Sequence, residues 1–563
     1  MPGRPASSVE ERLRARILER LDELGWPAPG ELAVERPRDP AHGDWSSNVA
    51  LALAKPLRRA PRAIAEELAR AWQPEPGLVD SVEVAGPGFV NFRLRPDVYA
   101  SALRKLLLDP DAYLRSDAGR GSSVIVEFVS SNPTGPLHIG HGRNAALGDA
   151  VASLLEAAGW SVTREYYFND AGNQMETLGR SLQARYSQLL DPSTSFPEGG
   201  YEGEYLVRIA EELRAELGDG LIDASDPAAS LPFFQARAAA VMVESIRADL
   251  EVFGVRFDSW FNESCLYQEG LVERALERLR DRGAVYESQG AVWFRSSAYG
   301  DSDDRVLVKS SGHPTYFLPD VAYHMDKHER GFARAVNVWG ADHHGYVPRM
   351  QAAMAALGYE PDWLHCIVYQ AVTLLEGGEA VKLSTRKARF VTLRELVQEV
   401  GAAVARYFLL MRRADTHLNF DLDVARAQSD ENPVYYVQYA HARSQSVFTR
   451  LLAAGAHDAR DTEPGRLAGA NLERLILPRE GDLLKLLAEF PDLVREAAVA
   501  REPHRVAGFL ERLAKEFHIW YHEVRILGED VELMRARLAL ARGVQIAVRR
   551  GLGLLGISAP EAM

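Results

Sequence analysis

Cysteine and long apolar runs are scarce in this sequence of 563 residues, and its 65 basic side chains are outnumbered by 79 acidic ones. Its two cysteines, Cys265 and Cys366, cannot build a disulfide framework, so we expect a reducing compartment. No run of about 18 apolar residues occurs, which predicts that no segment spans a membrane. The amino-terminal segment 1–21 lacks the apolar core of a signal peptide. These absences together predict a cytoplasmic protein.

The formal net charge of −14 at pH 7, taken alone, argues against a nucleic-acid partner. One segment opposes that inference, because residues 533–560 contain no acidic side chain. In the simpler interpretation, its arginines are the solvated side of a helix. We favour contact with phosphates, because the excess of one sign occurs within an acidic protein. These arginines are Arg535, Arg537, Arg542, Arg549 and Arg550.

The chain is too long for one hydrophobic core and predicts about three or four domains. Near the amino terminus we expect a helix that begins at Ser7 or Ser8 and ends at Gly25, a second helix over 49–57, and a hairpin over 79–94. This small α+β unit ends near residue 110, and the GRGSS stretch at 119–123 is a linker.

A parallel α/β pattern follows the linker. Strand, helix and strand are predicted over 124–129, from Ile139 to Gly159, and over 162–168, and a ligand site belongs at the carboxyl end of the first strand. Insertions are expected at 191–204 and in the antiparallel pattern of 291–317. Parallel strands return at 335–339 and 365–374, and from about residue 404 the pattern predicts helices throughout.

Two histidines, His138 and His141, lie at the start of the predicted helix within EFVSSNPTGPLHIGHGR. They could be ordinary helix-start residues. Gly140, Gly142 and Ala145 also match the GxGxxA fingerprint of dinucleotide-binding proteins, but about ten loop residues separate them from the strand, which argues against a dehydrogenase. The third interpretation is the HIGH signature of class I aminoacyl-tRNA synthetases, which the sequence spells without a substitution.

A second basic motif follows the last predicted parallel strand. KLSTR at 382–386 stands where class I synthetases carry KMSKS, a loop that takes up charge developing on pyrophosphate. Lys382 and Ser384 match that motif, whereas Thr385 replaces its second lysine. Arg386 or Lys387 could supply the second charge. The two motifs in this order indicate a synthetase more strongly than either does alone.

Four carboxylates occur at or near the expected strand ends, namely Glu127, Glu263, Asp320 and Asp342. Any one of them could cap a helix or pair with a neighbouring base. Four around one site favour a cationic substrate, because a guanidinium needs carboxylate partners.

The chain resembles the bacterial-type arginyl-tRNA synthetases from end to end. HGDWSSNVALALAK at 42–55 resembles their amino-terminal domain, which contacts the tRNA elbow. Their catalytic core is resembled by three segments, YYFNDAGNQM, PTYFLPDVAYHMDK and VWGADHHGYVPRM. Their helical anticodon-binding domain is resembled by ENPVYYVQYAHAR and by the closing LGLLGISAPEAM. The resemblance implies an α/β Rossmann-like class I catalytic domain with insertions, preceded by a small α+β domain and followed by an all-α helical bundle. The expected boundaries are 1–110, 119–403 with insertions over about 176–330, and 404–563.

The resemblance also implies the reaction. Arginine attacks the α-phosphate of ATP, which is bound with Mg²⁺, and the arginyl group then passes to the terminal adenosine of tRNA(Arg). The catalytic residues are His138, His141 and Lys382, and ATP binding adds Gly140, Asp342 and Ser384. The implied arginine-binding residues are Glu127, Asn132, Glu263, Tyr316, Asp320 and Asp342. The tRNA-binding candidates, chosen as aromatic side chains able to stack on bases, are Tyr436, Tyr439, Trp520 and Tyr521. We expect a monomer that holds no metal of its own.

Two other functions remain open at this point. ADHHG at 341–345 contains the DHH triplet of metal-dependent phosphoesterases, and His324 with His328 has metal-ligand spacing on a helix. No paired aspartates precede that triplet near the first strand, which argues against a hydrolase. A non-catalytic tRNA-binding paralogue is compatible with Thr385 and predicts no arginine-dependent aminoacylation.

Overall fold

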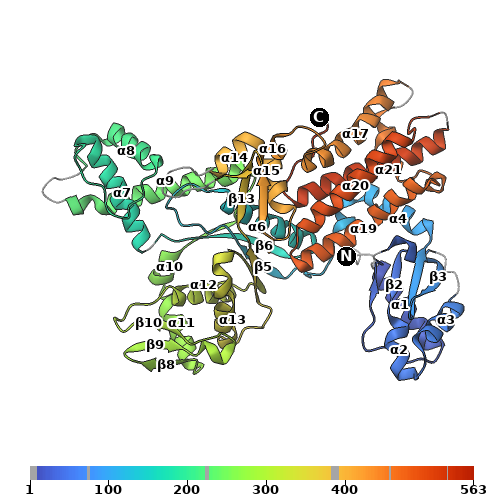
Figure 1. Cartoon of the computed structure of the whole chain (residues 1–563), viewed down its shortest axis with the longest axis horizontal. Helices are drawn as coiled ribbons and strands as arrows, with labels where there is room; N and C mark the ends of the chain where they lie inside the picture. Colours follow the sequence, from blue (N-terminus) through green and yellow to red (C-terminus); the bar gives the residue numbers. More distant parts are fainter. Residues whose placement is uncertain are drawn as a thin grey trace.

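The computed structural model describes residues 9–563 apart from 38, 73–76, 171, 222–226, 382–391, 456–457 and 529. Figure 1 shows a small amino-terminal unit beside a long helical bundle, with the central sheet and its insertions on the other side. Among these residues, no helix combines the length and apolar character needed to cross a membrane.

The amino-terminal unit has the predicted α+β character. Its antiparallel sheet has the strand order β1-β2-β4-β3, and α1 buries Leu13, Ile17 and Leu21. The predicted hairpin is β3 and β4, and the predicted second helix is α2. The elements are α1 Val9–Glu23, β1 Val34–Glu35, η1 Pro40–His42, β2 Trp45–Ser47, α2 Val49–Leu57, α3 Pro61–Ala71, β3 Val79–Ala85 and β4 Phe89–Leu94. Helices α4 Pro96–Leu108 and α5 Pro110–Leu114 lead out of this unit.

The central sheet is parallel throughout, with the order β12-β11-β5-β6-β7. Numbered along the chain, this order is 3-2-1-4-5 read from β7, the doubly wound order of nucleotide-binding folds. Strand order reverses between β5 and β11, so the ligand crevice belongs at the carboxyl ends of these two strands. The strands and first helix are β5 Ser123–Glu127, α6 Ile139–Ala157, β6 Ser161–Phe168, β7 Ser259–Asn262, β11 Arg334–Gly340 and β12 Leu364–Tyr369.

Two insertions interrupt the sheet. The first, between β6 and β7, is helical with its own core around Leu182, Leu206 and Phe234. The second, between β7 and β11, holds the antiparallel sheet β10-β9-β8, as predicted. The first contains α7 Asn173–Leu190, α8 Glu204–Leu217, η2 Pro227–Ser230 and α9 Leu231–Val252. The second contains α10 Glu263–Gln268, α11 Leu271–Asp281, β8 Val285–Ser288, β9 Ala291–Phe294, η3 Ser296–Tyr299, β10 Arg305–Val308 and α12 Phe317–Glu329.

Two predicted elements were wrong in detail. The strand expected over 365–374 is broken, because the chain leaves the parallel sheet after Tyr369 and enters a second sheet of order β14-β13-β15. The region expected to be all helical contains β15, which pairs in parallel with β13. Its alternation of buried Leu418 and Phe420 was too short to detect. The elements here are η4 Ala341–Tyr346, α13 Val347–Ala356, β13 Val372–Glu376, β14 Glu379–Ala380, α14 Leu393–Val400, α15 Ala402–Leu410, β15 Leu418–Asp421 and α16 Leu422–Arg426.

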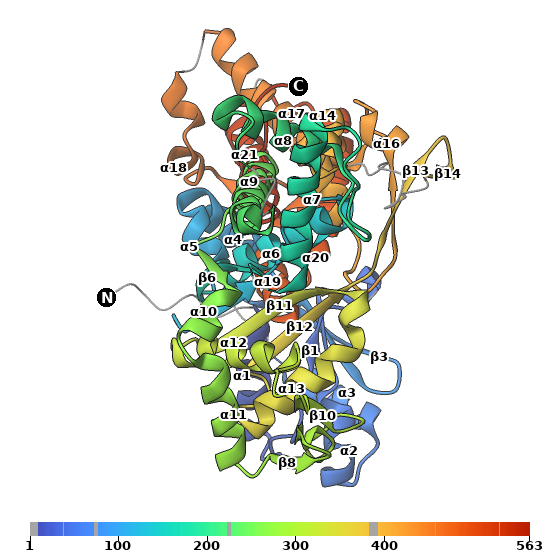
Figure 2. The same ribbon diagram turned by 90° about the vertical axis from the view of Figure 1, so that its left-hand side faces the viewer.

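The carboxyl-terminal part is a helical bundle, and α4 packs against its helices α19 and α21. In Figure 2 most of the bundle lies toward the top of the view and most of the amino-terminal unit toward the bottom. The fold therefore has the three predicted parts: a small α+β unit, a doubly wound sheet with insertions, and a bundle. The bundle contains α17 Pro433–Ala453, η5 Ala459–Thr462, α18 Pro464–Leu467, η6 Leu472–Arg474, α19 Pro478–Ala500, α20 His504–Glu523 and α21 Val531–Leu554.

Candidate active site at the carboxyl edge of the parallel sheet

The two histidines lie at the amino terminus of α6, directly beyond the carboxyl edge of the sheet. His138 is the N-cap residue, and its Nδ1 accepts a hydrogen bond from the Gly140 amide at 3.1 Å. The Nδ1 of His141 accepts from the His138 amide at 3.3 Å. Since each Nδ1 is an acceptor, the single proton of each neutral ring is on Nε2. The backbone thus fixes both tautomers, so the donor of each ring is its Nε2–H group.

Burial keeps both imidazoles neutral. It lowers the pKa of His138, and it lowers the pKa of His141 to about 3, with a further contribution from His138. The two rings stack with their centroids 3.8 Å apart, an arrangement that disfavours two positive charges. At neutral pH the pair therefore supplies hydrogen-bond donors at a helix amino terminus, where the helix dipole also favours anions.

Glu127, at the end of β5, is buried and fully partnered. Its Oε2 accepts from Lys327 Nζ at 2.5 Å and from Asn337 Nδ2 at 2.9 Å, and its Oε1 accepts from Ser130 Oγ at 3.0 Å. Lys327 is itself completely buried and also donates to Asn337 Oδ1 at 3.2 Å. This carboxylate is consequently held in one orientation by an internal cation.

Asp320 and Glu263 lie near Glu127 but form no ion pair with any described residue. Burial, together with the charges of Glu263 and Glu127, raises the pKa of Asp320 to about 7, against the hydrogen bond that Tyr346 donates to it. Burial also raises the pKa of Glu263. Two carboxyl groups without a cation, in a buried site, have the electrostatic character of a pocket for a cationic ligand.

The other three residues predicted to bind arginine lie at an exposed rim. The Asn132 amide donates to Gln174 Oε1 at 2.6 Å. Tyr316, just before α12, is 78% exposed. Asp342 lies in η4 with an exposed side chain, 3.3 Å from His343 Nδ1. The structure therefore brings Glu127, Glu263 and Asp320 together, whereas Asn132, Tyr316 and Asp342 are exposed.

Sequence reasoning missed the buried polar network beneath the carboxylates. Asp320, His324 and Lys327 share one face of α12, because they are four and three residues apart. The Nδ1–H of His324 donates to the Asp320 carbonyl at 2.8 Å, and its Nε2 accepts from Asn337 at 2.9 Å. Polar residues at this helical spacing next to a buried strand were the signal that could have identified them.

Arg143, two residues after His141, was also missed. Its side chain is completely buried, and its guanidinium donates to the carbonyls of Gln370, Arg413 and Thr416 at 2.6, 2.9 and 3.0 Å. These carbonyls precede β13 and β15, so the helix that carries the histidines also holds the base of the second sheet. The burial lowers the pKa of Arg143 to about 10.

The second predicted motif, with Lys382, Ser384, Thr385, Arg386 and Lys387, lies outside the described residues. The segment that follows it is anchored beside the histidines. Leu393 N donates to the Leu137 carbonyl at 2.7 Å, and Thr392 forms a β-bridge with His138. The chain thus returns from the second motif to the first.

The bundle presents three of the four aromatic candidates to solvent at least in part: Tyr436, Tyr439 and Tyr521. Trp520 is fully buried in the bundle core, so the prediction that it stacks on a base was wrong for this structure. A large apolar ring at a core-facing position of α20 fills space between helices.

The basic stretch of α21 is only partly available for other contacts. Arg537 pairs with Glu480 at 2.8 Å, Arg550 pairs with Asp111 at 2.9 Å, and Arg542 lies 3.8 Å from the ring centre of Phe448. Arg535 and Arg549 are exposed and form no ion pair within the described parts of the chain. They are the arginines of this stretch that remain as candidates for phosphate contact.

The histidines considered as metal ligands have unrelated partners. His324 belongs to the buried network, whereas His328 stacks on Tyr359 with ring centroids 3.7 Å apart. Among the described residues, no group of three or more His, Cys, Asp or Glu side chains has metal-binding geometry.

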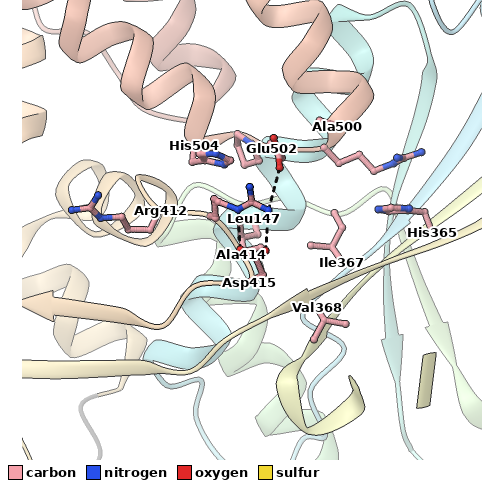
Figure 3. Close-up of a pocket in the computed structure, with 13 residues that line it drawn as sticks. Leu147, His365, Ile367, Val368, Arg412, Ala414, Asp415, Ala500, Glu502 and His504 are labelled. Carbon is pink, nitrogen blue, oxygen red and sulfur yellow. Dashed lines mark hydrogen bonds and ion pairs between the residues drawn. The ribbon is translucent and has the colours of Figure 1, made fainter. Parts of the chain in front are cut away.

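A cavity of about 170 Å³ lies away from this site, where the sheet meets the bundle. Figure 3 shows Leu147 of α6, His365 and Ile367 of β12, and Glu502 and His504 at the turn between α19 and α20 around it. None of the predicted site residues lines this cavity, so it belongs to the junction between the two parts.

The fold and the site define a class I aminoacyl-tRNA synthetase. The features that do so are the doubly wound sheet, the HIGH histidine pair at its switch point and the helical bundle that follows in the chain. Three family models match the chain: "Arginyl tRNA synthetase N terminal domain" over 11–94, "tRNA synthetases class I (R), catalytic domain" over 102–195 and 234–427, and "DALR anticodon binding domain" over 437–563.

Whole-chain relatives agree with these matches. The chain is 49% identical to an arginine--tRNA ligase of Syntrophotalea carbinolica, over 99% of this chain and 100% of the relative. It is 46% identical to that of Geobacillus thermodenitrificans, over 99% of both chains. The arginyl-tRNA synthetase structure from Thermus thermophilus is similar with a TM-score of 0.73 at 26% identity, over 98% of this chain and 100% of that one. The chain belongs to the arginyl-tRNA synthetase family.

Proposed function

We propose that the chain activates L-arginine with ATP and transfers the arginyl group to the 3′-terminal adenosine of tRNA(Arg) for use in translation. The observation that carries the proposal is the group of buried carboxylates at the switch point, next to a histidine pair held at a helix amino terminus. We assign the site for a cation to these carboxylates and the site for a phosphate to the histidine pair. The established family supports the same reaction.

In the proposed arginine pocket, one carboxylate is paired with an internal lysine and two carboxylates have no such partner among the described residues. Glu127 is already neutralised by Lys327, so it orients the ligand without adding net negative charge. Glu263 and Asp320 supply the unpaired negative charge, and they favour a guanidinium because carboxylates accept its donors in pairs. Asn132, Tyr316 and Asp342 close the rim around the bound amino acid.

The phosphate side uses donors rather than a nucleophile. His138 and His141 donate from Nε2–H to ATP phosphate oxygens, and Gly140 allows close approach because it has no side chain. Asp342, Lys382 and Ser384 complete the ATP site, and Lys382 neutralises the leaving pyrophosphate. Mg²⁺ enters as part of the ATP complex, so we assign no protein carboxylate to a resident metal.

The remaining assignments concern the whole molecule. The division into 1–110, 119–403 with insertions at about 176–330, and 404–563 is kept, with the first unit at the tRNA elbow and the last at the anticodon. Tyr436, Tyr439 and Tyr521 are the stacking candidates. The protein acts in the cytoplasm as a monomer.

The decisive experiment is charging of total tRNA with each of the twenty amino acids, with and without ATP. Arginine alone is expected to be incorporated, and only with ATP. Incorporation of another amino acid would refute the pocket assignment, and no incorporation at all would support a non-catalytic tRNA-binding paralogue.

The second motif has its own test. Lys382→Ala is expected to slow adenylate formation more than Lys387→Ala does, measured as arginine-dependent exchange of pyrophosphate into ATP in the presence of tRNA. The reverse order would make Lys387 the lysine that meets pyrophosphate.

A further inference from the structure

The loop between β5 and the histidines begins with a strained turn. Ser130 N donates to the Phe128 carbonyl at 2.9 Å, which makes a γ-turn centred on Val129. Val129 has φ 64° and Ser130 has φ 42°. Positive φ in a γ-turn is rare and costly, most of all for a β-branched residue. Such a conformation persists only where its surroundings enforce it.

Helix α6 enforces this turn through two residues on one face. Asn144 Oδ1 accepts from the Val129 amide at 2.7 Å, while its Nδ2 donates to the Val338 carbonyl of β11 at 2.9 Å. One helical turn later, Gly148 lies against the Phe128 ring so closely that an added Cβ would be 2.1 Å from its Cγ. Asn144 and Phe128 are both buried, so the contact excludes water.

The turn determines where Ser130 points. Its Oγ donates to Glu127 Oε1 at 3.0 Å and accepts from the Tyr167 amide of β6 at 3.1 Å. With an unstrained residue conformation at 129, the chain would leave β5 in another direction, and Glu127 would lose this donor. Strain in the backbone thus supports the orientation of a carboxylate.

We propose that Asn144 is a positioning residue for amino-acid binding: it holds the strained turn at Val129, through which Ser130 orients Glu127. This inference rests on the proposed place of Glu127 in the arginine pocket. It connects the helix that carries the phosphate-binding histidines with the pocket on the neighbouring strand.

The variant Val129→Gly distinguishes two explanations of the role of Asn144: holding a strained turn, or stabilising the fold as a buried amide. Glycine adopts positive φ without the steric cost that valine carries. If Asn144 acts by holding a strained turn, the turn in Val129→Gly no longer depends on Asn144. If Asn144 is only a buried amide that stabilises the fold, glycine at 129 adds a second defect.

The test compares Asn144→Ala, Val129→Gly, the double variant and Ser130→Ala in the full-length enzyme. Ser153→Ala is the control, because it removes a side-chain hydrogen bond from the same helix away from the turn. KM for arginine and kcat are measured by aminoacylation, and thermal unfolding is followed in parallel. Asn144→Ala is expected to raise KM for arginine about tenfold with little change in kcat, as expected for loss of one buried hydrogen-bonded contact. The double variant should recover to within about threefold of Val129→Gly.

Additive or larger losses in the double variant would overturn the proposal, as would an unchanged KM in Asn144→Ala. Ser130→Ala leaves the Asn144 contact in place and removes the donor to Glu127, so it should raise KM for arginine on its own. An unchanged KM in Ser130→Ala would also overturn the proposal, even if Asn144→Ala fails to fold. Failure of the proposed function is distinguishable, because the unmodified enzyme would then not charge tRNA with arginine.

Discussion

The carboxyl edge of the sheet and the surface of the bundle use polar side chains in opposite ways. At the edge, Glu127 has partners on three other segments, and the histidine tautomers are set by backbone amides. On the bundle, Arg535 and Arg549 are exposed, and Tyr521 has a single hydrogen bond, from Arg450. The proposed site for a small substrate is prepared in advance, whereas the side chains of the proposed tRNA surface have fewer fixed partners among the described residues.

This difference predicts that substitutions at the edge act on catalysis and on arginine binding, whereas those on the bundle act weakly and on tRNA alone.

His138→Ala removes the Nε2–H group that we propose donates to the reacting phosphate. We expect kcat for aminoacylation to fall about 10³-fold, in the range found for lost transition-state donors. His313→Ala, an exposed histidine elsewhere, is the control. Filter binding should show unchanged affinity for tRNA. A kcat close to that of the unmodified enzyme would contradict the assignment of the histidine pair to the active site.

Asp320→Asn removes one of the two unpaired carboxylates. KM for arginine should rise about a hundredfold, because a buried charge on the ligand loses its partner. KM for ATP should stay within about threefold, since the phosphate side is made by other residues. Glu329→Gln on the same helix, whose carboxylate pairs with Arg274 and Arg278, is the matched control. An effect on ATP alone would contradict the assignment.

The pH dependence of arginine binding should have its midpoint near the raised pKa of Asp320, about 7. Arginine binds the ionised carboxylate, so binding releases a proton, and KM should rise up to about tenfold for each pH unit below the pKa and stay level above it. Burial lowers the pKa values of His138 and His141, which moves their titration away from this midpoint. The acid limb should therefore disappear in Asp320→Asn and persist in His138→Ala.

Two neighbouring aromatic residues give the smallest expected functional effect. Tyr521→Ala should raise KM for tRNA about fivefold, as for the loss of one stacked base, and leave KM for arginine unchanged. Trp520→Ala should instead lower the free energy of unfolding by about 3–5 kcal/mol, because it opens a cavity in the core. Chemical denaturation and tRNA titration of both variants separate the two roles. Equal losses of stability in the two variants would contradict the assignment of Trp520 to the core and Tyr521 to the surface of α20.

The long, regular parts of the fold were predictable because local pattern and tertiary structure agree there. The alternation and run length around β5, α6 and β6 gave their order and type. β15 was not predictable, because four residues carry too little periodicity and its partner β13 is distant in the sequence. The break after Tyr369 depends on Arg143, a contact between segments that no local pattern contains.

The same contrast holds in the site. Glu127, Glu263 and Asp320 were predictable because strand and helix ends bring carboxylates to one edge. Lys327 and Asn337 were not, because a lysine on a helix is usually solvated and its burial depends on how α12 packs against the sheet. Trp520 was misjudged for the reverse reason, since its residue type suits both a core and a stacking surface.

The hydrogen bond from the Leu393 amide to the Leu137 carbonyl joins two residues that are far apart in the sequence. The chain between these two residues includes both insertions, and its two ends lie next to each other at this contact. Because the closing contact is made by backbone atoms, it does not depend on which side chains occupy either position. Insertions between Leu137 and Leu393 can therefore differ in length without removing the contact that joins these two residues.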